Sequence, residues 1–277
     1  MGHASPGASV NGAVNYLGPM NVRPEFFSEA QDKNNLNLEG HDIVVSDFRG
    51  RGGEVDLAGA GFTLVDHRSS IADFRDAERV AARYRPEIVE LITGLTGARK
   101  VIVTGPVFRW SEREEHPEMT NSRPARFVHV DYSLDAFHGF ARTHLGDDPD
   151  ADAWLAGRYA AFNIWRVLSP PPQDCPLAVI DRRSTERVDV VEGDAVIDAK
   201  DRPEFRFGSS LYAHSPRHRW GYFSDMTPEE ALVFLAYDSA DERVPGCPHS
   251  AFDDPTCPPD AVPRTSCEIR AYAYWGS

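Results

Sequence analysis

The chain has 277 residues and a formal net charge of −14, from 43 acidic and 29 basic residues. Such a surface repels a phosphate backbone, which argues against a nucleic-acid-binding protein. Hydrophobic residues make up 41% of the chain, but no apolar run approaches the roughly 20 residues that a membrane-spanning helix needs.

The first residues lack the basic segment and the apolar stretch of a signal peptide, which predicts a cytoplasmic protein. The four cysteines are too few for a disulfide scaffold, and none forms a C-x-x-C pair. A zinc site built from the last three is the alternative reading, because their spacing is even. We expect reduced cysteines without a metal.

The first part of the chain is expected to support the β-sheet core rather than to form it. Residues 1–40 are rich in Gly, Asn and Pro and show no apolar period, so we expect an extended arm. Apolar residues then recur at helical spacing over 71–95, and Pro86 within this run predicts two helices or one kinked helix. Residues 1–99 are thus predicted to be an N-terminal arm and helical support region.

Residues 100–277 are predicted to hold the core, with a helical insert near 134–158. Strands are expected over 100–108, 127–132 and 161–168, a polar loop over 111–126, and helices over 134–143 and 150–158. Further short apolar segments, separated by turn residues, are expected to be antiparallel strands at 177–180, 187–191, 195–198, 205–213, 218–223, 231–237 and 266–274. Because helices gather early and strands late, we predict one domain, 1–277, that is mainly β with flanking helices (α+β), a double-stranded β-helix or cupin-like jelly roll.

Two side chains on the predicted strand 127–132 indicate a metal site. His129 and Asp131 are two residues apart, so they project from the same face of the strand. His249, 120 residues downstream, would complete the two-His-one-carboxylate triad of non-haem Fe(II) oxygenases. An isolated H-x-D is usually a surface pair, so the interpretation depends on the segment after His249.

Arg264 and Ser266 share one face of the predicted strand that comes after His249. A guanidinium binds a carboxylate through two parallel hydrogen bonds, and a hydroxyl adds a third, which suits the distal carboxylate of 2-oxoglutarate. The 2-oxo acid end would then chelate the metal. We therefore predict Fe(II) as cofactor and 2-oxoglutarate as cosubstrate.

Other polar residues have less specific predictions. His218 competes with His249 as third ligand, but a packed or substrate-facing role is expected for it, and Trp220 either lines a substrate pocket or packs in the core. Asn163 and Arg166 lie on opposite faces of one predicted strand, so both cannot face the iron without a bulge. We expect Asn163 to contact the cosubstrate or a metal ligand.

Arg166 is expected to form a structural ion pair or to contact the substrate. Glu268 and Arg270 share the face of the predicted cosubstrate residues, and we expect a salt bridge between them at the far end of the barrel. The acidic stretch 112–118, just before the metal strand, is a candidate lid.

Several separated motifs also resemble a known family. They are VHVDYS (128–133), NIWR (163–166), PLAV with Asp181 (176–181), HRWGYFS (218–224), YDS (237–239), PHSAF (248–252) and PRTSCEIR (263–270). In order and approximate spacing they resemble the AsaB-like oxygenases, which include fungal gibberellin desaturases and the cephamycin methoxylation protein. The resemblance implies a double-stranded β-helix and dependence on iron and 2-oxoglutarate, but no substrate.

The leading hypothesis is hydroxylation or desaturation of a small secondary metabolite or amino-acid derivative by dioxygen, with succinate and CO2 as coproducts. One alternative is a cupin-type metal-dependent oxygenase or hydrolase that does not use 2-oxoglutarate. The other is a non-catalytic accessory protein of a biosynthetic pathway. A small molecule, rather than nucleic acid or a membrane, is the expected partner, and the oligomeric state stays open.

Overall fold

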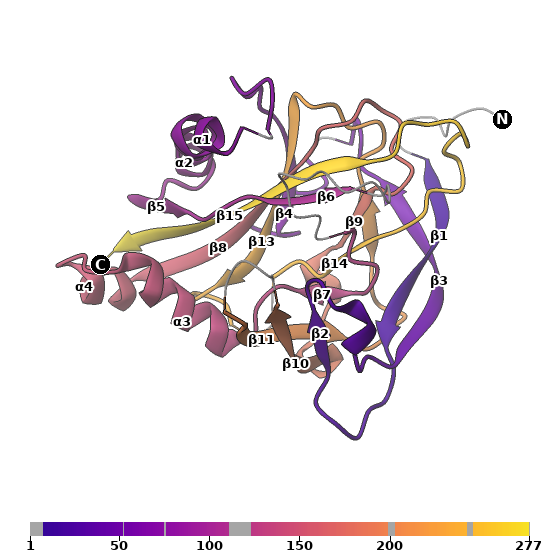
Figure 1. The fold of residues 1–277 in the computed structure, drawn as a ribbon, viewed down its shortest axis with the longest axis horizontal. Helices are drawn as coiled ribbons and strands as arrows, with labels where there is room; N and C mark the ends of the chain where they lie inside the picture. Colours follow the sequence, from indigo (N-terminus) through magenta and orange to yellow (C-terminus); the bar gives the residue numbers. More distant parts are fainter. Residues whose placement is uncertain are drawn as a thin grey trace.

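The computed structural model describes residues 8–51, 53–74, 76–110, 123–198, 203–242 and 246–276. Two β-sheets make up most of it (Figure 1). The larger sheet contains, in spatial order, β1 (Ser9–Leu17), β3 (Leu38–Asp47), β12 (Trp220–Tyr222), β9 (Leu177–Ile180), β14 (His249–Ala251), β7 (His129–Val130), β11 (Phe205–Tyr212), β10 (Val190–Ile197) and β2 (Glu25–Phe27).

The smaller sheet contains β4 (Phe62–Asp66), β13 (Glu230–Asp238), β8 (Arg158–Val167), β15 (Thr265–Gly276) and β5 (Lys100–Val103), and β6 (Val107–Trp110) also pairs with β15. The helices are α1 (Ala77–Arg79), α2 (Arg85–Thr96), α3 (Leu134–Leu145) and α4 (Ala151–Ala156). A π-helical segment, Val80–Tyr84, joins α1 to α2, and short 3-10 turns lie at Gln31–Lys33, Arg182–Ser184 and Arg187–Asp189.

Alternating side chains divide the smaller sheet into two buried faces. On one face Ile164 and Ile269 pack against Ile88 and Ile92 of α2. On the other face Trp165, with other apolar residues of β8 and β13, packs against the larger sheet. Helix α3 covers one end of this face, because Phe137 and Ala141 contact the tyrosines of β8 and β15. The interior is therefore a layer between two sheets, closed at one end by α3 (Figure 1).

The helical region predicted over 71–95, as two helices or one kinked helix, is present as α1, the π-helical segment and α2, which follow one another directly. Pro86 stands in the first turn of α2, where its missing N–H interrupts no α-helical hydrogen bond. Gly97 ends the helix in a left-handed conformation, with φ of 69°, which a residue without a Cβ adopts at little cost.

The N-terminal region differs from the predicted arm. Strands β1 and β3 pair antiparallel over nine residue positions and form one edge of the larger sheet, so residues before 99 contribute strands as well as helices. The prediction missed them because the apolar alternation is incomplete: Gly12 stands between Val10 and Val14 in β1, and the first half of β3 buries no side chain. The predicted strand 100–108 is two strands, β5 and β6, and the predicted strand 127–132 keeps ladder pairing at His129 and Val130 alone.

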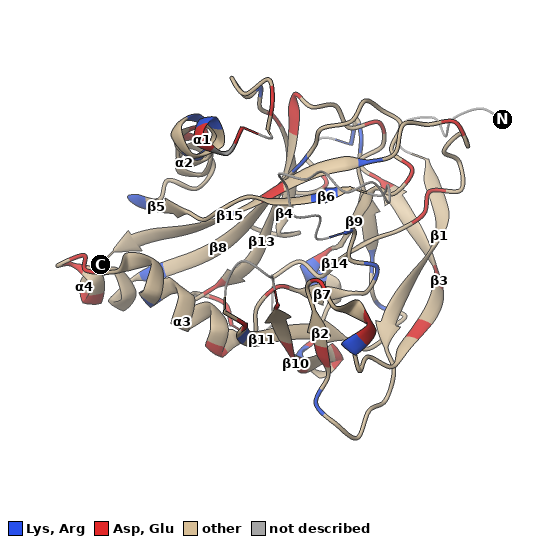
Figure 2. Cartoon of the chain, viewed as in Figure 1, with Lys and Arg blue, Asp and Glu red and all other residues tan. Residues whose placement is uncertain are grey.

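Charged residues lie mainly on loops, turns and helices, whereas the long strands β8, β13 and β15 carry few of them (Figure 2). Within the described ranges, none of the helices is long and apolar enough to cross a membrane. The candidate lid, residues 112–118, lies outside the described residues.

Candidate metal centre

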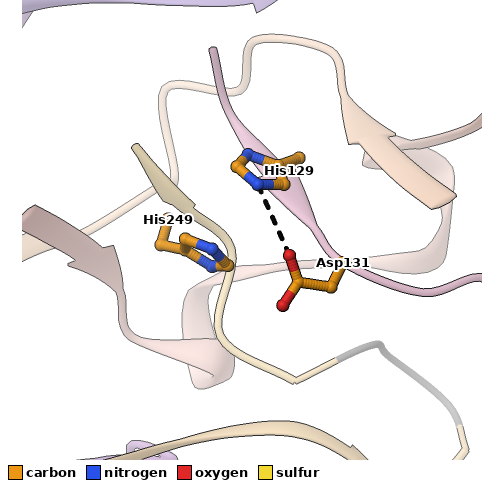
Figure 3. A group of neighbouring side chains, drawn as sticks. All are labelled: His129, Asp131 and His249. Atoms are coloured by element: carbon orange, nitrogen blue, oxygen red, sulfur yellow. Dashed lines mark ion pairs between the residues drawn. The ribbon is translucent and has the colours of Figure 1, made fainter. Parts of the chain in front are cut away.

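His129, Asp131 and His249 come together at the centre of the larger sheet (Figure 3). His129 of β7 pairs directly with His249 of β14, so the two imidazoles stand on the same face of the sheet. One ligand atom from each of the three side chains lies within 4.8 Å of the other two, and Nε2 of His129 lies 3.7 Å from Oδ1 of Asp131. In the part of the chain that the structure describes, this is the one group of His, Cys, Asp or Glu placed to hold a metal.

The backbone fixes which nitrogen of each imidazole faces the site. Nδ1 of His129 donates to the carbonyl of Phe127 at 2.9 Å, and Nδ1 of His249 donates to the carbonyl of Cys247 at 3.2 Å. Each Nε2 therefore keeps its lone pair for a metal. Burial, together with the neighbouring His249, lowers the pKa of His129 to about 4, and burial also lowers the pKa of His249. Both rings are neutral at pH 7, as metal ligands must be.

Asp131 is held ionised by the residues behind it. Its Oδ2 accepts hydrogen bonds from Nδ2 of Asn163 at 2.6 Å and from Nε of Arg270 at 2.8 Å. Burial opposes ionisation, but the charge of Arg270 and its hydrogen bond outweigh it and hold the pKa of this carboxyl below its usual range. Oδ1 is left facing the two histidines, so the three side chains offer the donors of a two-His-one-carboxylate site.

The salt bridge between Glu268 and Arg270 is present, with Oε1 and Nη2 2.5 Å apart, but the prediction that it lies at the far end of the barrel is wrong. Arg270 pairs in register with Asn163, and both side chains point at Asp131. The sequence indicated this position of Arg270, because Arg270 is an even number of residues from Arg264 and therefore lies on the same face of the strand.

Arg264 lies just before β15 and is 1% exposed. Its Nη1 donates to the carbonyl of Cys175 at 2.6 Å, its guanidinium lies 5.6 Å from the ring centroid of Trp165, and its Nε has no hydrogen-bond partner among the described residues. Burial lowers the pKa of Arg264, since few nearby groups balance its charge. A buried cation with an unmet donor fits an anionic ligand.

A narrow cavity connects this arginine to the metal site. Its lining includes His129, His249, Arg264, Trp165 and Glu268. At about 10 Å³ the cavity holds no more than a water molecule, so a dicarboxylate that reached from the two histidines to the guanidinium would have to displace side chains that line it. In the chemistry of their donors, the residues present fit both a divalent metal and 2-oxoglutarate.

Ser266 is buried beside Arg264, but its hydroxyl donates to the carbonyl of Arg109 at 3.3 Å, and it is not among the lining residues of the narrow cavity. A contact between Ser266 and the cosubstrate stays a prediction.

The three residues predicted to contact substrate are not brought to the metal. His249 pairs with Val179, and Val179 pairs with Gly221, so Gly221 shares the metal face and Trp220 points to the opposite face. There Nε1 of Trp220 donates to the hydroxyl of Tyr16 at 3.1 Å.

His218 joins the same cluster, because its Nδ1 lies 2.8 Å from the Tyr16 hydroxyl and its Nε2 lies 3.3 Å from Oδ2 of Asp189. Arg166 lies behind the smaller sheet, where it contacts Tyr84, His67 and the carbonyl of Pro228. These placements match a packed role for Trp220 and a packed, ion-paired role for His218. The partners of Arg166 among the described residues include no carboxylate, so its predicted ion pair is not shown.

A second cavity, of about 1150 Å³, also borders the metal site and shares His129 with the first. Its lining includes His129, Asp131 and Arg270 at the floor and a wall of aromatic side chains, among them Phe26, Phe127, Tyr132, Phe140, Phe205 and Phe207. The cavity is large enough for a molecule of drug size. The metal site therefore borders both a narrow polar cavity and a wide aromatic one.

The sequence and the fold have relatives. The family model described as "Oxidoreductase/YMDC permease-like domain" matches residues 14–274. The hydroxylase/desaturase CTB9 of Cercospora beticola is 31% identical over 86% of this chain and 77% of its own length. The hydroxylase/desaturase asaB of Aspergillus flavus is 33% identical over 67% of this chain and 88% of its own length.

The Fe(II)/2-oxoglutarate-dependent dioxygenase nvfI of Aspergillus novofumigatus is 31% identical over 89% of this chain and 87% of its own length. The solved structure of the iron and alpha-ketoglutarate-dependent endoperoxidase NvfI superposes with a TM-score of 0.81 and 26% identity, over 97% of this chain and 99% of that one. The chain therefore belongs to this family of non-haem Fe(II)/2-oxoglutarate-dependent oxygenases, with the jelly-roll fold and the iron and cosubstrate dependence that its sequence predicted.

Proposed function

We propose that this enzyme hydroxylates or desaturates an unactivated C–H bond of a small secondary metabolite. The observation that carries the proposal is the position of His129, Asp131 and His249 beside both the narrow cavity of Arg264 and the wide aromatic cavity. The aromatic lining favours a metabolite with a large apolar skeleton.

In this proposal His129, Asp131 and His249 hold Fe(II), and Arg264 holds the distal carboxylate of 2-oxoglutarate. Bound iron and 2-oxoglutarate together supply the activation of dioxygen, with succinate and CO2 as coproducts. The protein's own part is to fix the ligand geometry through Asn163 and Arg270 and to keep water away from the reacting carbon with the aromatic wall.

Binding of the cosubstrate tests the role of Arg264. Anaerobic titration of the Fe(II)-loaded protein with 2-oxoglutarate should produce a weak visible charge-transfer band. Arg264→Ala should abolish this band at cosubstrate concentrations that saturate the unchanged protein, while the protein still binds iron, because the distal carboxylate loses its cation. Arg264→Lys, which retains the positive charge but not the two parallel N–H donors of the guanidinium, should restore part of the affinity for 2-oxoglutarate.

A band of unchanged strength in Arg264→Ala would contradict the assignment of Arg264. Absence of any band in the iron-loaded parent would instead favour an enzyme that does not use 2-oxoglutarate, the alternative that the relatives speak against. Substrate-dependent formation of succinate then tests the reaction itself. Mass analysis of the product separates hydroxylation from desaturation, and from endoperoxidation, the activity for which the NvfI structure is named. A cytoplasmic location stays a prediction.

A further inference from the structure

We infer that the substrate is a lipophilic acid, whose anionic group binds Arg85 in the wall of the wide cavity. The inference rests on the proposed function, since it concerns the substrate of the same site. It goes further by naming the chemical class that the cavity selects: an apolar skeleton that carries a carboxylate, a sulfate or an acidic enol.

The described lining of the wide cavity holds more arginines than carboxylates, although the protein is acidic. The chain carries a net charge of −14, yet the described residues that line the cavity include four arginines and two carboxylates. One of these carboxylates, Asp131, faces the metal site, and the other, Glu29, is exposed. Because carboxylates already pair with Arg270 and Arg126, positive charge for an anionic ligand has to come from an arginine without a carboxylate partner.

Three of the four arginines are already engaged. Arg270 is paired with Asp131 and Glu268, Arg126 with Asp253 at 2.8 Å, and Arg109 donates to the carbonyl of Arg123 at 2.7 Å. Arg85 differs from them. Among the residues that the structure describes, no side chain forms an ion pair with it, and its buried Nε has no hydrogen-bond partner.

The position of Arg85 suits a substrate anchor. It stands at the start of α2, and its Nη2 lies against the turn between β5 and β6, 3.8 Å from where a Cβ on Gly105 would be. The preceding residue of that turn, Thr104, donates its N–H to the carbonyl of Arg270 at 2.9 Å. The turn therefore lies between Arg85 at the start of α2 and β15, the strand that carries Arg270.

The rest of the cavity suits the apolar part of such a molecule. Phe140 packs edge-to-face on Phe207 with ring centroids 5.3 Å apart, and Phe26 packs on Phe127 at 5.1 Å. These rings offer extended apolar surface without a hydrogen-bond donor or acceptor. An acid bound to Arg85 would thus be held by one charge and by aromatic side chains in the same cavity that His129 and Asp131 line.

Two fluorescent probes with the same ring system test the inference in the anaerobic protein loaded with Fe(II) and 2-oxoglutarate. Anilinonaphthalene sulfonate is anionic, and N-phenyl-naphthylamine is its neutral counterpart. Arg85→Gln should weaken binding of the sulfonate about tenfold, because one charge-assisted contact is lost, and should leave binding of the amine unchanged. Arg85→Lys should restore most of the affinity for the sulfonate. Arg83→Gln, an exposed arginine two residues earlier, is the matched control and should change neither.

Equal affinity of Arg85→Gln and the parent for the sulfonate would overturn the inference, and so would an equal loss for both probes. The charge-transfer band is read in the same samples. If the charge-transfer band is normal but Arg85→Gln affects both probes alike, the lipophilic-acid assignment alone is wrong. If the parent protein shows no band, the proposed function is wrong.

Discussion

Asp131 makes contacts with three different parts of the chain. One oxygen faces the two histidines, and the other is held by Asn163 from β8 and Arg270 from β15. A carboxylate held on one oxygen by two donors cannot rotate freely, so its free oxygen is already aimed at the metal position. Arg270 pairs with both Asp131 and Glu268, so this buried group of two carboxylates and one guanidinium keeps one negative charge, which a divalent cation at the metal site would offset.

Asn163→Ala removes one of these two donors without removing a charge. We expect the affinity for Co(II), used in place of Fe(II), to fall roughly tenfold to a hundredfold, which is typical for loss of a residue that orients a metal ligand. Titration followed by the visible absorption of bound Co(II) measures this. Asn37→Ala, whose side chain bonds the carbonyl of Pro19 on the surface, is the control. Equal affinities in both variants would show that Arg270 alone orients Asp131.

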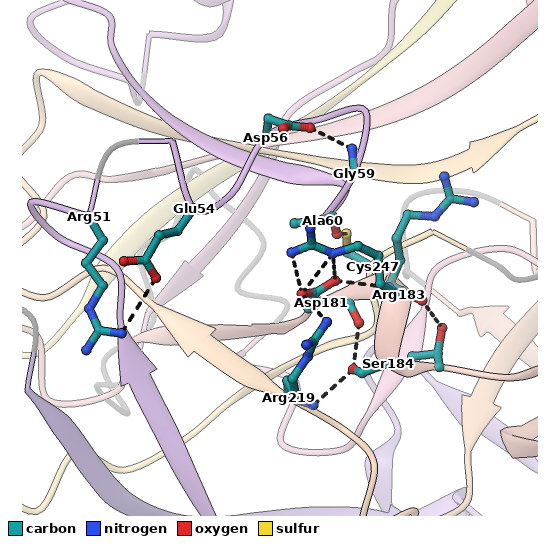
Figure 4. A network of polar contacts seen from close by, with 12 residues as sticks. Arg51, Glu54, Asp56, Gly59, Ala60, Asp181, Arg183, Ser184, Arg219 and Cys247 are labelled. Carbon is teal, nitrogen blue, oxygen red and sulfur yellow. Dashed lines mark hydrogen bonds and ion pairs between the residues drawn. The ribbon is translucent and has the colours of Figure 1, made fainter.

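At the scale of elements, Asp181 joins the end of β9 to the start of β12 (Figure 4). Its carboxylate accepts from Nε and Nη2 of Arg183 and from Nη2 of Arg219 at 2.9 Å, and its backbone N–H donates to the carbonyl of Arg219. Burial raises the pKa of Asp181, but the hydrogen bonds and charges of the two arginines outweigh it, so the pKa lies below its usual value. β9 carries Val179, the neighbour of His249, so this junction supports the metal strand.

Asp181→Asn should lower the free energy of unfolding at pH 7 by about 1–3 kcal/mol, the cost of unpairing a buried charged group. A depressed pKa stabilises the fold above the unfolded value of about 3.9, and this contribution is lost as the pH falls through the lower folded value. The difference between parent and variant should therefore shrink below about pH 4. Urea unfolding at several pH values measures it. The control is Asp152→Asn, at a side chain 90% exposed, which should change the free energy of unfolding by no more than about 0.5 kcal/mol. If Asp181→Asn lowers the free energy of unfolding by the same amount at all pH values, the electrostatic explanation is wrong.

At the scale of the whole molecule, the metal site lies where two strands of the larger sheet are joined by very little pairing. β7 has two residues, and its ladder to β14 consists of the single pair His129 and His249. These strands are 120 residues apart in the chain, and the structure between them includes α3, β8 and β9. A metal bound to both strands would cross-link them, so metal binding and folding should be coupled.

Adding Co(II) to the metal-free protein should therefore raise its thermal midpoint. At a free concentration one hundred times the dissociation constant, the gain in free energy is about 2.7 kcal/mol. Scanning calorimetry with and without metal measures the shift. His249→Ala should lose most of it, whereas His41→Ala, on the opposite side of the sheet beside Tyr16, should keep it. A shift retained in His249→Ala would mean that the metal stabilises the protein from another site.

The local spacing of residues predicted much of this protein. The period of two residues along a strand placed His129 with Asp131, and the helical period predicted the helical region that α1, the π-helical segment and α2 form. These inferences succeed because each depends on the geometry of one continuous segment. The order of the motifs also indicated the family, and with it the iron and the cosubstrate.

The tertiary structure alone decided which segments became neighbours. Arg270 meets Asp131 across 139 residues, and Trp220 turns away from the metal, because strand pairing and register set the face on which each side chain lies. Arg85 and the aromatic wall of the wide cavity come from segments far apart in the chain. No local period encodes such a cavity, since its shape depends on how two sheets and a helix pack together.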